Sequence, residues 1–249
     1  MSIITLEIAA ESINSVRMIE KRRIADRIEL CDNLVVGGTT PSAGLIRLSR
    51  KNTTLPVMVL IRPRSGDFLY SDAEFEVMLS DIAFAKKEGM DGIVTGILKQ
   101  DGQVDRDRMI QVVEAARPMQ ITFHRAFDMA LDPFEAIDTL VDLGIDRVLT
   151  SGQMASAWDG RDLIRKVVDY TKNLPISIMA GGGVNAQNVK DLVKITGVRE
   201  VHTSARSKVE SKMTLRRDQM SMARPIELDE YQWLETDSDI ASEIREKLG

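Results

Sequence analysis

Residues 176–185 read Ile176-Ser177-Ile178-Met179-Ala180-Gly181-Gly182-Gly183-Val184-Asn185, an apolar run followed by three glycines. A short apolar run of this kind is typical of a buried strand. The glycines allow a tight turn, and Asn185 predicts the start of a helix that Gly197 ends. We therefore interpret the stretch as one strand–loop–helix unit of a parallel sheet.

The same unit recurs along the chain. Two further helices have clear first residues: one is expected to begin at the N-cap Asp72, and one at Asp132 with Pro133 in its first position. Short apolar runs predict strands at residues 3–8, 25–31, 56–61, 91–95, 119–124, 146–150, 175–180 and 199–203.

Eight strands alternating with helices predict an α/β protein with the closed (β/α)8 fold, the TIM barrel. The competing architecture, a doubly wound sheet, expects Gly-x-Gly-x-x-Gly after its first strand, and Ile8-Ala9-Ala10-Glu11 lacks those glycines. No stretch is rich enough in proline or serine to be a linker, so residues 1–249 are expected to form a single domain. Its extended C-terminal segment, about 206–249, is expected to hold a long loop and a closing helix after Asp239.

The composition narrows the possible partners. A net charge of −5 offers no broad basic surface, so no nucleic-acid partner is expected. No apolar run is long enough to span a bilayer, so no membrane partner is expected either. The first residues, Met1 to Glu7, lack the basic region of a signal peptide, and a single cysteine, Cys31, is consistent with a reducing cytoplasm.

Alternate residues of a barrel strand face the interior. This alternation places the following side chains inside: Thr5, Glu7, Glu29, Cys31, Gln120, Thr122, His124, His202 and Ser204. Both histidines of the chain are therefore expected to face inward. Buried carboxylates need partners, and Arg62 and Arg125 are the candidates for Glu7 and Glu29.

Four of these residues form the predicted catalytic pocket at the C-terminal rim of the barrel. Glu7 or Glu29 is a candidate general acid or base, His124 a candidate proton shuttle or electrophile, and Arg62 a candidate for holding a carboxylate. The alternative is that a Glu–Arg or Glu–His network only fills the barrel mouth. A cluster of such residues at this rim favours a working site.

A separate anion site is predicted after the seventh and eighth strands, where barrels commonly bind phosphate. Gly181, Gly182 and Gly183 let backbone N–H groups approach an anion, and a following helix adds the positive end of its dipole. Ser204 and Arg206 are expected to complete the site from the eighth strand. The predicted ligand is a small phosphorylated or carboxylated molecule.

The loop at residues 62–71 is long, charged and carries Phe68 and Tyr70. One interpretation is a lid over the barrel mouth. The other is a surface loop in which Arg64 and Asp67 pair locally. The sequence leaves these two equally open.

Metal binding has two candidate donor sets. Copper(I) prefers thiolate and thioether ligands, and Cys31 is the one thiol, although it is also an ordinary small buried hydrophobe. Most of the 13 methionines are expected to fill the core. Glu7, Glu29 and His124 are the alternative set, suited to a harder divalent ion.

Several uncommon strings of this chain resemble the CutC family, named for copper homeostasis. The likeness runs from Glu7 to about Met222 and rests on Glu29-Leu30-Cys31, Thr40-Pro41-Ser42-Ala43-Gly44, Arg62-Pro63-Arg64-Ser65-Gly66-Asp67-Phe68, Asp91-Gly92-Ile93-Val94, Thr122-Phe123-His124-Arg125-Ala126-Phe127-Asp128 and Leu149-Thr150-Ser151-Gly152. The resemblance implies a (β/α)8 barrel in the cytoplasm that takes part in copper homeostasis and forms a homodimer or higher homo-oligomer. It also implies copper(I) as a ligand, and Cys31 is the residue that receives this role here.

Three hypotheses follow. The first is a copper-handling protein that binds copper(I) through Cys31. The second is a barrel enzyme that acts on a small phosphorylated or carboxylated metabolite by Glu/His acid–base chemistry. The third is a scaffold without chemistry, whose mouth is plugged by Tyr70 or by the C-terminal segment.

Overall fold

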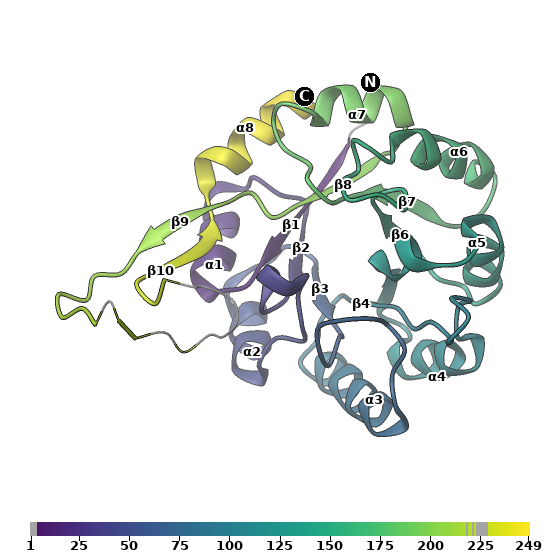
Figure 1. The fold of residues 1–249 in the computed structure, drawn as a ribbon, viewed down its shortest axis with the longest axis horizontal. Coiled ribbons are helices and arrows are strands. Elements are labelled where there is room, and N and C mark those ends of the chain that lie inside the picture. Colours follow the sequence, from purple (N-terminus) through teal and green to yellow (C-terminus); the bar gives the residue numbers. More distant parts are fainter. Residues whose placement is uncertain (1–3, 218, 221, 223–228) are drawn as a thin grey trace.

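The computed structural model describes residues 4–217, 219, 220, 222 and 229–249. It confirms the closed parallel barrel, with a ring of helices around it (Figure 1). The barrel strands are β1 Thr5–Ala10, β2 Arg27–Leu30, β3 Val57–Leu60, β4 Gly92–Thr95, β5 Gln120–Phe123, β6 Arg147–Thr150, β7 Ser177–Ala180 and β8 Glu200–Thr203. Each overlaps a predicted strand, and the largest shift is in the first, expected at residues 3–8.

The barrel closes because β1 pairs with both β2 and β8. Glu7 lies opposite Arg27 of β2 on one side and opposite His202 of β8 on the other. This register puts three chemically active side chains at one level of the interior. The helices are α1 Ile13–Arg22, α2 Ala43–Asn52, α3 Asp72–Lys87, α4 Arg106–Ala116, α5 Pro133–Asp142, α6 Arg161–Thr171, α7 Val189–Thr196 and α8 Ser238–Leu248, with the short 3₁₀ helices η1 Leu34–Val36 and η2 Arg125–Met129.

Local caps set the helix starts. Asp132 caps α5 with Pro133 at its first position, as predicted. The predicted N-cap Asp72 is wrong by one residue: Ser71 caps α3, because its hydroxyl and the Glu74 carboxylate form a reciprocal capping box.

The prediction that α7 begins at Asn185 is also wrong. The Asn185 side chain accepts a hydrogen bond from the Gln187 N–H at 3.0 Å and so closes a local turn instead. The helix begins at Val189, and Gly197 ends it with a φ of 74°, as predicted.

The barrel interior has two layers of different character. Below, near the strand starts, lies a group of buried charged residues: Glu7, Arg27, Arg147 and Glu200. Above that layer, toward the strand ends, an apolar cluster inside the barrel holds Ala9, Cys31, Met58, Leu60 and Val94. A separate and larger apolar core fills the space between the strands and the helices.

The C-terminal segment is more ordered than a long loop. β9 (Arg206–Glu210) pairs antiparallel with β10 (Gln232–Thr236), and this hairpin projects from the barrel (Figure 1). The expected loop is therefore wrong for residues 206–210 and 232–236, because these ten residues pair with one another as a two-stranded sheet. The predicted closing helix is α8, which packs against α7 and α1 and buries Ala241 and Ile244. Within the described residues, no helix combines the length and apolarity needed to cross a bilayer.

Candidate functional site

A cavity of about 530 Å³ lies at the barrel mouth. Its lining comes from strand ends and from the loops that follow them. Glu29, Arg62 and His124 all line it, so three of the four predicted pocket residues share one cavity. Tyr70 is buried but is not among the lining residues, so it is not the plug of this space, which the scaffold hypothesis assigned to Tyr70 or to the C-terminal segment.

Glu7 lies beneath the cavity and is fully buried. Its carboxylate binds the Arg27 guanidinium, and its Oε1 lies 2.8 Å from Nδ1 of His202. Burial alone would raise the pKa of Glu7, but Arg27 and His202 together lower it to about 2. Glu7 is therefore a permanent carboxylate that holds its neighbours in place.

The predicted partners of the glutamates, Arg62 and Arg125, are wrong. Arg27 takes that place for Glu7 because the two residues are in register on adjacent strands, on the same side of the sheet. Arg62 sits higher, at the end of β3, and binds backbone carbonyls of Val36 and Gly38 at 3.0 and 2.7 Å. It joins the loops of the rim and brings a positive charge to the cavity.

Glu29 is the acidic residue of the cavity floor. Its Oε2 lies 3.6 Å from Nε2 of His202. Burial raises the pKa of Glu29 to about 7; the charge of Glu7 adds to this rise and that of His202 opposes it. Burial by itself would lower the pKa of His202. The two glutamates outweigh this effect and raise the pKa.

A chain of ion pairs continues below Glu7. Arg27 and Arg147 each donate to Glu200 Oε2 at 2.6 Å, and Arg147 also donates to Thr122 at 3.1 Å. Sequence reasoning placed Thr122 inside but missed these three charged residues. The alternation that located Glu29 also includes residues 27, 147 and 200, so applying it down to the strand starts would have found them.

The loop at residues 62–71 has the local ion pair of the surface-loop interpretation, and one of its aromatic side chains reaches the cavity. Arg64 pairs with Asp67 at 3.0 Å, as expected for a surface loop. Phe68 turns inward, lines the cavity, and has its ring 4.8 Å from the ring of His124. The guanidinium carbon of Arg62 lies over the Phe68 ring, 5.1 Å from the ring centre. One aromatic side chain of this loop therefore covers part of the cavity.

Four of the five residues of the predicted anion site line the mouth cavity, and Gly181 does not. Gly182 and Gly183 line the cavity and have positive φ angles of 97° and 73°. Gly181 lies below them, where a Cβ atom would meet Leu149 at 2.5 Å, and it does not line the cavity. Ser204 and Arg206 line the cavity as well, and Arg206 also pairs with Glu11 at 3.1 Å.

A second arginine faces the glycine loop. A Cβ atom on Gly182 would lie 3.4 Å from the Arg125 guanidinium carbon, so this side chain lies against the glycine loop. Asp128 accepts from Arg125 Nε at 2.7 Å, and Arg125 Nη2 donates to Ser151 at 2.7 Å. The motifs 122–128 and 149–152 therefore meet, and together they hold the Arg125 side chain at the cavity wall.

The possible metal ligands also differ from the prediction. His202, rather than His124, joins Glu7 and Glu29, and one ligand atom of each lies within 4.8 Å of the others. His124 is outside this group because it follows the end of β5, four strands away from β1 around the barrel. The Glu7 oxygens in this group are already bound by Arg27 and His202.

Cys31 lies inside the barrel, as predicted, and is fully buried. Its Sγ is 3.7 Å from the carbonyl oxygen of Ala10. Burial raises the pKa of the Cys31 thiol well above its usual value, and the charge of Glu29 adds to the rise. The thiol form therefore prevails, and a metal ion has to displace its proton.

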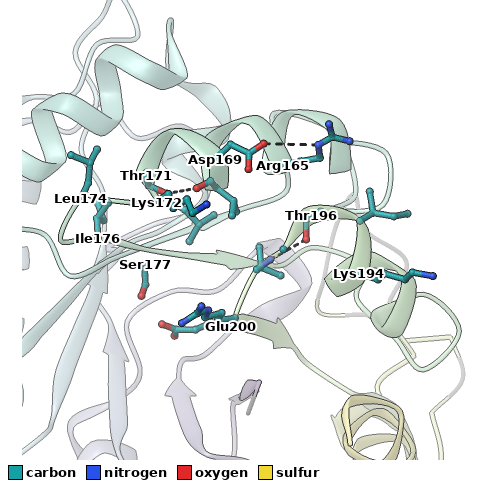
Figure 2. Close-up of a pocket in the computed structure, with 16 residues that line it drawn as sticks. Arg165, Asp169, Thr171, Lys172, Leu174, Ile176, Ser177, Lys194, Thr196 and Glu200 are labelled. Atoms are coloured by element: carbon teal, nitrogen blue, oxygen red, sulfur yellow. Dashed lines mark hydrogen bonds and ion pairs between the residues drawn. The ribbon is translucent and has the colours of Figure 1, made fainter. Parts of the chain in front are cut away.

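A cavity of about 600 Å³ at the opposite end of the barrel has a different character (Figure 2). It lies between α6 and α7, and Arg165 and Asp169 on its rim pair with each other. Glu200 at its inner edge is engaged by the buried arginines. Because TIM-barrel active sites lie at the C-terminal ends of the strands, this cavity is not the candidate site.

The geometry can be set beside known proteins. The model of the CutC family matches residues 4–207. A copper homeostasis protein cutC homolog from Mus musculus is 44% identical over 93% of this chain and 85% of its own length. A protein from Salmonella schwarzengrund that is named as a family protein, CutC, is 45% identical over 90% of each chain.

Solved structures agree. The putative copper homeostasis protein CutC from Streptococcus agalactiae matches with a TM-score of 0.77 and 37% identity, over 81% of this chain and 99% of that one. An N-(5'-phosphoribosyl)anthranilate isomerase from Pyrococcus furiosus matches over 98% of each chain with a TM-score of 0.56, but at 14% identity it shows the barrel fold alone. From the family model and these relatives, the chain belongs to the CutC family.

Proposed function

We propose that this protein is an enzyme whose mouth cavity binds a small phosphorylated or carboxylated metabolite and moves a proton on it. The observation that carries the proposal is Glu29, a buried carboxyl group on the cavity floor whose pKa is raised to about 7. A proton-transfer group is most effective when its pKa lies near the working pH. His202 stands behind Glu29, and Glu7 holds its ring by the hydrogen bond at Nδ1.

The cavity wall supports an anionic ligand. Arg125 and Arg206 line it as cations, and Ser204 adds a hydroxyl group. Gly182 and Gly183 line it with backbone in a positive-φ conformation that glycine adopts readily. Arg62 contributes charge and rigidity, since its guanidinium is tied to the rim loops. These residues would bind the charged end of the ligand, and Glu29 would act on the other end.

The test compares binding with proton transfer. Small carboxylates and sugar phosphates are screened by thermal shift and then by isothermal titration calorimetry. For a ligand that binds, exchange of its C–H protons in D₂O is followed by NMR. Arg125→Gln is expected to weaken binding by roughly tenfold to a hundredfold, because a charge-assisted contact is lost. Glu29→Gln is expected to retain binding and to lose exchange by at least about a hundredfold.

Asp138→Asn on the outer face of α5 is the control and should match the wild type in both assays. Two results would contradict the proposal. One is that no anion of either class binds to the wild type. The other is that Glu29→Gln exchanges the ligand protons at the wild-type rate.

A second candidate is a role in copper homeostasis with copper(I) bound at Cys31. The names of the mouse and streptococcal relatives favour it. Cys31 shares its buried cluster with Met58, and a thiol beside a thioether matches the ligand preference of copper(I). The raised pKa of the thiol opposes metal binding, and one chain supplies no second thiolate.

Anaerobic competition with a chromogenic copper(I) chelator tests this candidate. The expected result is about one copper(I) per chain, lost in Cys31→Ser and weakened in Met58→Leu. Met179→Leu is the matched control, because Met179 is a buried barrel methionine outside the Cys31 cluster. An unchanged affinity in Cys31→Ser would rule the site out.

We also propose a cytoplasmic location and a homo-oligomeric state, as the family resemblance implies. Light scattering coupled to size-exclusion chromatography is expected to give at least twice the mass of one chain. A mass equal to one chain at high micromolar concentration would contradict the oligomer.

A further inference from the structure

His124 has one nitrogen that the protein does not use. Its Nδ1 accepts a hydrogen bond from the Ala126 N–H at 3.2 Å, so the ring proton is on Nε2. Among the described residues no atom accepts from Nε2, which is buried in a residue that is 5% exposed. A buried donor without a partner costs about 1–3 kcal/mol, so its retention beside a cavity needs an explanation.

The ring is fixed in place. Phe68 packs on it at 4.8 Å between ring centres, and Gly96 leaves it room, since a Cβ there would lie 2.7 Å from Nδ1. Burial, followed by the nearby charge of Arg62, lowers the pKa of His124 to about 3. The imidazole is therefore neutral at physiological pH and donates from a single tautomer.

We propose that His124 Nε2–H is the hydrogen-bond donor for a carbonyl oxygen of the substrate, which makes the substrate an anionic carbonyl compound with an acidic neighbouring C–H. The inference deepens the proposed function and rests on it. Glu29 and His124 line the same cavity from β2 and from the end of β5, so a ligand between them meets a base on one side and a donor on the other. A carboxylate base opposite a neutral imidazole is a known arrangement for enolisation.

The step is balanced without a co-reactant. The Glu29 carboxylate takes the proton from the carbon next to the carbonyl, and the C–H electron pair forms the C=C bond. The carbonyl π electrons move to oxygen, where the negative charge is stabilised by the Nε2–H donor. Exchange results when the proton on Glu29 is replaced from solvent before a proton returns to the same carbon. In a hydroxy-carbonyl compound, isomerisation results when the proton returns to the former carbonyl carbon while the hydroxyl proton of the neighbouring carbon passes to the former carbonyl oxygen, so that the C=O bond forms at the neighbouring carbon.

The experiment uses oxalate and 2-phosphoglycolate, anions whose planar carboxylate groups mimic an enolate, and inorganic phosphate as the anion that lacks such a group. The variants are His124→Phe, which keeps the ring packing and removes the donor, and His124→Gln, which keeps a side-chain N–H. Calorimetry is expected to show one mimic binding to the wild type at least tenfold more tightly than phosphate. His124→Phe should reduce that affinity by roughly tenfold to a hundredfold and change phosphate affinity by less than twofold. His124→Gln should recover part of the loss.

NMR of ¹⁵N-labelled histidine gives an independent readout. His124 is expected to show a neutral ring protonated at Nε2 from pH 5 to 9, and the mimic should shift this resonance. Three results would overturn this inference and leave the proposed function standing. They are a protonated His124 ring, a ring protonated at Nδ1, and equal affinity of the wild type and His124→Phe for the mimic. If neither the mimics nor phosphate bind, the proposed function and this inference both fail.

Discussion

Glu29 and His202 differ from ordinary surface groups because they share a buried site with Glu7. The charge of His202 lowers the pKa of Glu29, whereas burial and Glu7 raise it. Carbon-detected NMR of the side-chain carboxyl groups is expected to give a Glu29 midpoint near 7. In His202→Gln the midpoint should move higher, because the opposing positive charge is gone. Glu29→Gln identifies the resonance, and a midpoint near the ordinary 4.5 would contradict the assignment.

The stability of the charged layer in the lower barrel interior depends on Arg27. Arg27 binds Glu7 and Glu200, and both carboxylates are largely removed from water. Arg27→Met is therefore expected to lower the free energy of unfolding by about 3–5 kcal/mol, because it leaves buried charge without a partner.

A double-mutant cycle separates this effect from lost packing. Glu7→Leu combined with Arg27→Met should cost less than the sum of the two single changes, since the pair is removed together. Urea unfolding measures all three variants. Strict additivity would show that the two side chains do not interact.

At the scale of elements, the loop between β6 and α6 holds the cavity wall. Gly160 caps α6, and a Cβ there would overlap the Ser151 carbonyl oxygen and crowd Gly152. Ser151 in turn binds Arg125 at 2.7 Å. A change at the start of one helix is therefore transmitted to the cation that faces the glycine loop.

Gly160→Ala is expected to lower the free energy of unfolding by about 1–3 kcal/mol, because backbone atoms rather than a flexible side chain must move. It should also weaken anion binding through the displaced Ser151. Gly44→Ala in α2 is the matched control: its new Cβ meets nothing closer than 3.9 Å, and it should stabilise by about 0.4–1 kcal/mol. Equal effects of the two changes would refute this account of the loop.

At the scale of the whole molecule, Glu7 and Glu29 make the free energy of unfolding depend on pH in two ranges, an acid limb and an alkaline limb. The pKa of Glu7 is lowered from 4.5 to about 2, so its contribution is present above pH 4.5 and is lost as pH falls toward 2. The pKa of Glu29 is raised from 4.5 to about 7, so its contribution is present below pH 4.5 and is lost as pH rises through 7.

Thermal unfolding across pH 3–9 is therefore expected to show greatest stability between these limbs. The free energy of unfolding of Glu29→Gln should exceed that of the wild type by about 1–3 kcal/mol between pH 5 and 8, because the glutamine has no charge to bury. Glu7→Gln should flatten the acid limb. A Glu29→Gln curve parallel to the wild type over this range would show that Glu29 titrates as an exposed carboxyl.

The sequence by itself determined the barrel, the order of its strands and which side chains face inward. Those features depend on local apolar runs and on alternation along a strand, which a single segment contains. Glu29, His124 and Cys31 were all located inside for this reason, and the relative position of His202 followed the same rule.

Tertiary structure alone decided which inward residues meet. Barrel closure sets β1 beside β8 and puts His202, not His124, between Glu7 and Glu29. The register between β1 and β2 chose Arg27 over Arg62 and Arg125 as the partner of Glu7. Hydrogen bonding across the barrel and burial, which no short window of sequence contains, then made one carboxyl group an ion and its neighbour a group that titrates near neutrality.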